Sequence, residues 1–213
     1  MQFSYLLSAF LATLAVASPI ANPEVEADIA ARDETYEAAA LEARAGGDTV
    51  PFEVLGPKAS GLKDGNWYVF AQKTPNGKRF DGDNFEPKDE LEKLQKTLKF
   101  AHIKLITGQY KETKGKGKKG KVEKRDFLDL KFHDLSKETK AMDAPIKLRH
   151  TKWSVSKDDK EEWKEQISFV KETTKAKIDA LSGFDAGYKK DHPKYSVDNN
   201  NCNSYAEFIK KKL

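Results

Sequence analysis

Residues 127–133 read Phe-Leu-Asp-Leu-Lys-Phe-His, and this stretch decides the fold class because apolar and polar side chains alternate along it. A period of two is typical of a β-strand that buries one face. One face would carry Leu128, Leu130 and Phe132, and the other Asp129, Lys131 and His133. We therefore predict a strand near 126–134, and a similar run that ends at Gly108 predicts a second strand near 100–107.

The two strands would pair as a hairpin whose centre lies near Gly117. Residue 102 then lies opposite residue 131 or 132, so that His102 and His133 become neighbours across the pair. The connection, residues 111–121, contains only Lys, Gly, Glu and Thr. Because these residues have no apolar surface to bury, we expect an exposed, flexible, basic loop.

Further runs complete a predicted α+β domain, in which an antiparallel sheet is packed with helices. A third run in the second half of the chain places His150 on the face of Ile146 and Leu148, and Ser182-Gly183 would close a long helix. The expected strands are near 67–71, 100–107, 126–134 and 146–154. The expected helices are near 88–99, 158–181 and 200–211.

The composition excludes several classes of protein. The chain has 213 residues, of which 38% are hydrophobic and 34% charged, and a single cysteine, Cys202. One cysteine excludes an intramolecular disulfide framework and a Cys-rich zinc module. The four histidines show no i,i+4 pair, so we expect neither a metal nor a cofactor.

The first 48 residues are not predicted to belong to the folded domain. Residues 1–21 combine an apolar run with small residues at A-x-A spacing, which is typical of a secretory signal peptide cleaved near 17–21. This apolar run is too short to span a membrane, and the rest of the sequence contains no apolar run of sufficient length. We therefore expect a secreted, extracellular protein without a transmembrane segment. Residues 22–48 hold eight acidic and two basic residues and predict a disordered propeptide or linker.

The single domain expected over 49–213 is strongly basic. It holds 36 basic and 26 acidic residues, so its charge near +10 is opposite in sign to that of the acidic segment. Arg44, before Ala-Gly-Gly, is a candidate processing point. The alternative is cleavage within the domain at the Lys-Arg pair Lys124-Arg125.

Cys202 is expected in the first turn of the last helix. Residues 198–201 are types that cap helix N-termini, and Tyr205 and Phe208 follow at helical spacing. The free N–H groups and the dipole at that helix end favour the thiolate, which is the nucleophilic form of cysteine. A nucleophilic cysteine also needs a general base and a third group that orients this base, and two histidines are candidates on adjacent predicted strands.

Two short motifs carry a resemblance to a known superfamily. The first runs from His102 to Gly108, and the second is Asn200-Asn201-Cys202 with Tyr195 ahead of it. This order resembles the circularly permuted papain-like superfamily, in which the histidine strand precedes the cysteine helix. The superfamily includes the lecithin:retinol acyltransferase-like, NlpC-related and desumoylating-isopeptidase-like families.

The resemblance implies roles for individual residues. Cys202 matches the nucleophile, His102 the base and His133 the third member, with His150 as the alternative third member. The backbone N–H groups of Asn201 and Asn203, at the first turn of the helix, would stabilise an oxyanion. The implied activity is that of a cysteine-dependent hydrolase or acyltransferase, which acts on an amide or an ester through a thioester intermediate.

The competing hypothesis is a secreted binding protein on a degenerate papain-like scaffold, which would bind cell wall, a membrane surface or a host partner without catalysis. In this hypothesis the basic loop is the contact surface. It would bind an anionic polymer or lipid through Lys114, Lys116, Lys118, Lys119 and Lys121. Nucleic acid is not expected as a partner, because no aromatic residues interleave with these lysines for base stacking.

Overall fold

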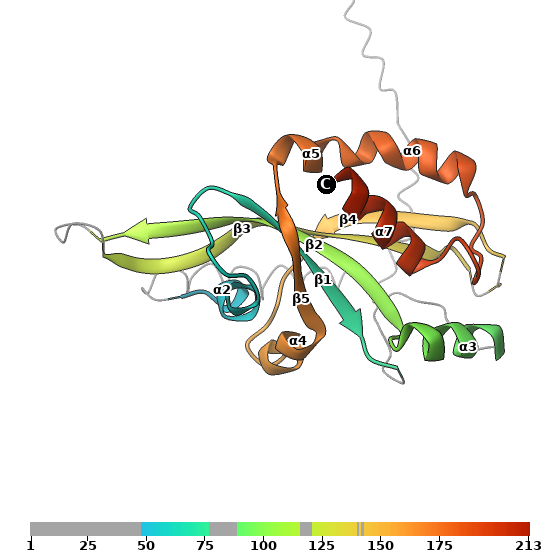
Figure 1. The fold of residues 1–213 in the computed structure, drawn as a ribbon, viewed down its shortest axis with the longest axis horizontal. Coiled ribbons are helices and arrows are strands. Elements are labelled where there is room, and N and C mark those ends of the chain that lie inside the picture. The colour runs from blue at the N-terminus through green and yellow to red at the C-terminus, as the bar shows by residue number, and fades with distance from the viewer. Residues whose placement is uncertain (1–47, 77–88, 116–120, 140, 142) are drawn as a thin grey trace, which may run out of the picture.

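The computed structural model describes residues 48–76, 89–115, 121–139, 141 and 143–213. The expected signal peptide, nearly all of the acidic segment, and Lys116, Lys118 and Lys119 lie outside these residues. The described chain forms a five-stranded antiparallel sheet in the order β4-β3-β2-β1-β5 (Figure 1), so the α+β class with an antiparallel sheet is confirmed. The strands are β1 Trp67–Thr74, β2 His102–Lys114, β3 Val122–Lys137, β4 Ile146–Lys152 and β5 Ile167–Thr173.

Helices cover both faces of the sheet (Figure 1). They are α2 Val50–Leu55, the 3-10 turn η1 Gly56–Lys58, α3 Asp89–Leu98, α4 Lys160–Gln166, α5 Lys175–Asp179, α6 Leu181–Asp191 and α7 Cys202–Lys212. Because neighbouring residues of a strand point to opposite faces, Leu105 packs in the core under α5, α6 and α7, while Ile106 packs in the core under α2 and α4. No helix within the described ranges has the length and apolar character needed to cross a membrane.

The sheet opens into a fork at one end. Pairing between β2 and β3 ends at Leu105↔His133. Beyond that point β2 stays paired with β1 as far as Thr74↔His102, and β3 stays paired with β4 as far as Lys137↔Ile146. The two pairs of strands diverge in Figure 1 toward the side where α3 lies, and α7 contacts both β2 and β3. The start of β2, at His102, and the point in β3 where its pairing with β2 ends, at His133, therefore flank an opening in the sheet.

The predicted long helix over 158–181 is wrong. Residues 160–166 form α4, but β5 follows at once as an edge strand paired with β1, and Thr174 then caps the short helix α5. The run Ile-Ser-Phe-Val-Lys-Glu-Thr suits a half-buried strand, and the free edge of β1 supplies the partner that a local pattern does not reveal. Ser182-Gly183 lies inside α6 and does not end a helix.

The hairpin is longer than predicted, and its register differs. Strand β2 continues through Gly108 to Lys114, so residues 111–114 are paired strand and not loop. A bulge lies where the register shifts between Thr107 and Gln109, opposite Asp129, which has a positive φ of 52°. The bulge ends the predicted alternation, because Leu130 is buried while Leu128 is 41% exposed.

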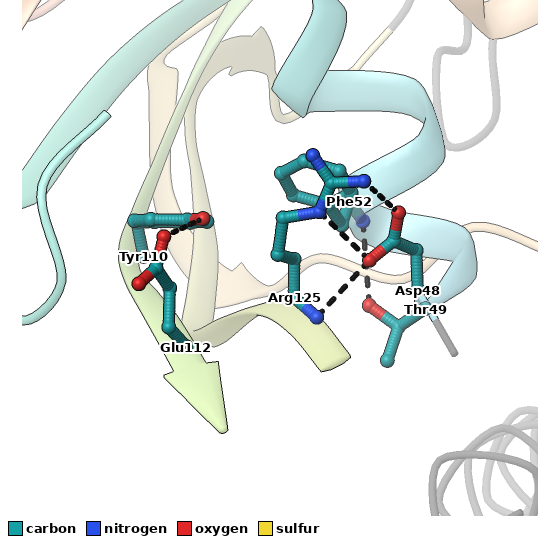
Figure 2. Close-up of polar contacts among 6 residues, drawn as sticks. All are labelled: Asp48, Thr49, Phe52, Tyr110, Glu112 and Arg125. Carbon is teal, nitrogen blue, oxygen red and sulfur yellow. Dashed lines mark hydrogen bonds and ion pairs between the residues drawn. The ribbon is translucent and has the colours of Figure 1, made fainter. Parts of the chain in front are cut away.

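Asp48 and Thr49, at the start of the described domain, attach to β3. Arg125 donates to both carboxylate oxygens of Asp48 and lies over the ring of Phe52, 4.5 Å from its centroid (Figure 2). Thr49 donates to Asp126 at 2.6 Å and caps α2 by accepting from Phe52. Asp48, expected at the end of the acidic segment, is thus bound to the domain, and Arg125 of the Lys-Arg pair is held in a paired strand.

Candidate functional site

The segment before Cys202 is fixed by two adjacent asparagines. Buried Asn200 donates to the carbonyl of His192 at 3.0 Å and accepts from the Tyr188 hydroxyl at 2.8 Å. Asn201 is the N-cap of α7: its side-chain oxygen accepts from the backbone N–H groups of Asn203 and Ser204, at 3.0 and 3.1 Å. These bonds place Cys202 at the first position of α7.

The two residues expected to stabilise an oxyanion have their backbone N–H groups engaged elsewhere. The N–H of Asn203 donates to the Asn201 side chain, and the N–H of Asn201 donates to the Ser204 hydroxyl at 2.7 Å. Together these bonds form a capping box. The motif Asn-Asn-Cys-Asn-Ser therefore builds the helix start, and its capping bonds use the N–H groups that we assigned to an oxyanion.

A buried ion pair crosses the fork of the sheet. The Nε2 atom of His102, from β2, lies 2.6 Å from Oδ1 of Asp134, from β3. The two residues are 5% and 2% exposed, so water hardly screens their interaction. Asp134 was not among the candidate residues predicted from the sequence.

Cys202 is the second neighbour of the His102 ring. Its buried side chain is near enough to His102 to raise the pKa of this histidine. Burial favours the neutral imidazole, but the charge of Asp134 and the side chain of Cys202 outweigh it and raise the pKa of His102 to about 10. Asp134 engages the Nε2 atom of the ring. The three side chains thus form a connected Cys-His-Asp group, and His102 is an imidazolium at neutral pH.

Arg149 binds the other side of Asp134. It lies directly opposite Asp134 across the β3–β4 pair, and its Nη2 atom is 2.5 Å from Oδ2. Burial would raise the pKa of the Asp134 carboxyl, but His102 and Arg149 outweigh it and lower this pKa to about 2. Asp134 is therefore ionised across the physiological range.

His133 and His150 belong to a separate network under α6 and α7. Nε2 of His133 is 2.9 Å from the Thr107 hydroxyl, and Nδ1 of His133 contacts Nδ1 of His150. Nε2 of His150 contacts Asp185 of α6, which also accepts from the Tyr205 hydroxyl at 2.8 Å. Burial first, and the nearby charge of His150 second, lower the pKa of His133 to about 3.

The structure thus brings together two of the predicted residues, Cys202 and His102, and puts Asp134 where we expected His133 or His150. The physical reason is the register. His133 pairs with Leu105, so His102, three residues earlier in β2, has the opposite orientation to Leu105 and His133 and the same orientation as Asp134. The sequence signal that could have identified Asp134 is the alternation of side-chain direction along β3. Asp134 directly follows His133, so its carboxylate points the opposite way.

No group of three or more His, Cys, Asp or Glu side chains that could hold a metal ion occurs in the described part of the chain. The chain matches no protein-family model, no curated protein and no solved structure.

Proposed function

We propose that this chain is a cysteine-dependent hydrolase or acyltransferase, in which Cys202 is the nucleophile, His102 the acid and base, and Asp134 the group that orients His102. The observation that supports this proposal best is the buried ion pair between His102 and Asp134, beside which Cys202 lies near enough to raise the pKa of His102. A thiolate needs a cation beside it, and an imidazolium held between a thiol and a carboxylate supplies one. We propose further that the fold is a permuted papain-like fold and that the protein is secreted.

The proposed reaction has two steps. The thiolate sulfur of Cys202, already deprotonated beside the imidazolium of His102, attacks the carbonyl carbon of an amide or ester, and His102 gives its proton to the departing amine or alcohol as the bond to carbon breaks. Water or an acceptor alcohol or amine then attacks the thioester, His102 removes a proton from it, and the thiolate leaves. The backbone N–H of Cys202 is the helix-end donor closest to the reacting sulfur, and we assign the oxyanion to it.

Alkylation of the thiol tests this proposal directly, because Cys202 is the only cysteine in the chain and each adduct is unambiguous by intact mass. We expect native protein to react with iodoacetamide at pH 6, where an ordinary thiol is almost entirely protonated. His102→Ala should slow the reaction at pH 6 and not at pH 10. His192→Ala is the matched control, because the His192 side chain is exposed and its bond to Asn200 is made by the backbone carbonyl, which the substitution keeps.

The burial of the site favours the second candidate, a binding protein without catalysis. Cys202 is only 7% exposed, so a substrate carbonyl reaches its sulfur only after local opening. A thiol that stays unreactive at every pH until the protein is denatured would overturn the enzyme proposal and favour this alternative. The exposed lysines at the described ends of the hairpin tip, Lys114 and Lys121, then become the surface to test against anionic polymer or lipid vesicles.

A further inference from the structure

Asp134 is held from two sides by strands that belong to different halves of the fork. Its Oδ1 atom binds His102 from β2, and its Oδ2 atom binds Arg149 from β4. Strand β4 remains paired with β3 through the fork, whereas the β2–β3 pairing has already ended. The position of Arg149 relative to Asp134 is therefore fixed by the sheet, while His102 approaches across the opening.

The two cations beside Asp134 differ in what happens to them during the proposed reaction. His102 loses its proton to the leaving group, and in that state it no longer neutralises Asp134. A buried carboxylate left without a cation tends to take up a proton. The guanidinium of Arg149 stays charged throughout, because the arginine side chain does not lose its proton in proteins. Arg149 is thus the partner that keeps Asp134 ionised while His102 is neutral.

The placement of the Arg149 side chain is consistent with this role. Its guanidinium carbon lies 6.0 Å from the centroid of the Phe132 ring, and its Nη2 atom lies 2.5 Å from Oδ2 of Asp134. Its Nε atom is buried without a hydrogen-bond partner among the described residues. An unpaired buried donor is unfavourable, so the hydrogen bonding of the guanidinium inside the protein rests on Nη2 and its contact with Asp134.

We propose that Arg149 is a positioning residue of the site: it presents Asp134 to His102 and keeps this carboxylate ionised when His102 has given up its proton. The inference rests on the proposed Cys202–His102–Asp134 function. The titratable groups around Asp134 are His102 of β2 and Tyr205 of α7, and Arg149 is the permanent charge.

Three variants test the role. Arg149→Met keeps the aliphatic length of the side chain and removes its charge, Arg149→Lys keeps the charge, and Lys147→Met is the control, since Lys147 is an exposed residue of the same strand. The readouts are the NMR titrations of the Asp134 carboxyl and the His102 ring, and the acid limb of the alkylation rate of Cys202.

Arg149→Met should move the Asp134 titration and the acid limb upward by at least one pH unit, Arg149→Lys should restore most of this shift, and Lys147→Met should leave both at the wild-type pH. A merely structural Arg149 would lower the melting temperature without moving either titration, and that result would overturn the proposal. If wild-type Cys202 proves unreactive, the proposed function fails, whereas the two NMR titrations still decide whether Arg149 controls Asp134. Should Arg149→Met not fold, an unshifted Asp134 titration in Arg149→Lys together with a lowered melting temperature would count against the role.

Discussion

Asp134→Asn keeps the shape of the side chain at the centre of the site and removes its charge. Burial, the largest influence on His102, lowers the pKa of this histidine, yet the net result is a rise from 6.5 to about 10. Asp134 acts through its charge and through its hydrogen bond, and each effect exceeds the matching effect of Cys202. The charge of Asp134 is the largest of the influences that raise this pKa, so its loss should bring the pKa of His102 well below about 10. A fall of about two pH units would correspond to about 3 kcal/mol.

The assay is an NMR titration of the His102 ring in wild type and in Asp134→Asn. The wild-type ring should stay protonated through pH 8, and the variant should titrate below that pH. Asp143→Asn is the matched control, because the Asp143 side chain is 78% exposed and pairs with Lys194 at the surface. A His102 titration that stays above pH 8 in Asp134→Asn would refute the electrostatic argument for the site.

The same substitution has a pH-dependent effect on stability. The His102 pKa is raised on folding, so its contribution is complete below pH 6.5 and is lost as the pH rises toward 10. The Asp134 pKa is lowered on folding, so its contribution is complete above pH 3.8 and is lost as the pH falls toward 2. Removing one partner of a buried pair costs roughly 3–5 kcal/mol. Urea unfolding should show the largest gap between wild type and variant between pH 3.8 and 6.5.

Three further substitutions test other parts of the fold. The pKa of His133 is lowered on folding, so wild type should lose stability as the pH falls from 6.5 toward 3, and His133→Gln should lose less, as measured by urea midpoints at pH 7 and 5. Asn201→Ala removes the N-cap of α7 and should lower stability by about 1–2 kcal/mol, whereas Asn203→Ala should have a smaller effect because its side chain caps nothing. Asp48→Ala frees the Arg125 guanidinium at the surface, so a dibasic-specific protease should cut after Arg125 faster than in wild type, and equal rates would show that the paired strand alone protects the bond.

The local sequence pattern was sufficient to predict those elements whose ends are marked by residues of their own segment. The four predicted strands and the last helix lie close to β1, β2, β3, β4 and α7, because turn residues and N-cap residues mark their ends. Residues 167–173 were missed because Ile167 and Val170 fit a helical stripe as well as a strand, and only the neighbouring edge of β1 selects the strand. The bulge at Asp129 is equally invisible in the sequence, since a regular alternation runs through it.

The residues of the candidate site also fall into two groups, those that a local motif predicts and those that depend on strand pairing. The proximity of Cys202 and His102 could be predicted because each belongs to a short motif, and their catalytic roles stay a prediction. Asp134 could have been predicted from the alternation along β3, had the register been known to one residue. Arg149 could not, because its contact depends on the pairing of β3 with β4, and nothing in residues 146–152 reports which residues of β3 lie opposite.

The adjacent positions of His133 and Asp134 limit where β3 can change in length. The two side chains leave the strand in opposite directions, one into the histidine network and the other to His102 and Arg149. Inserting or deleting one residue between the bulge at Asp129 and the fork would exchange them, putting an imidazole in the place of the carboxylate. The segment from residue 130 to 134 is therefore fixed in length, while the part of the hairpin between the bulge and the tip can gain or lose residues in pairs without disturbing either network.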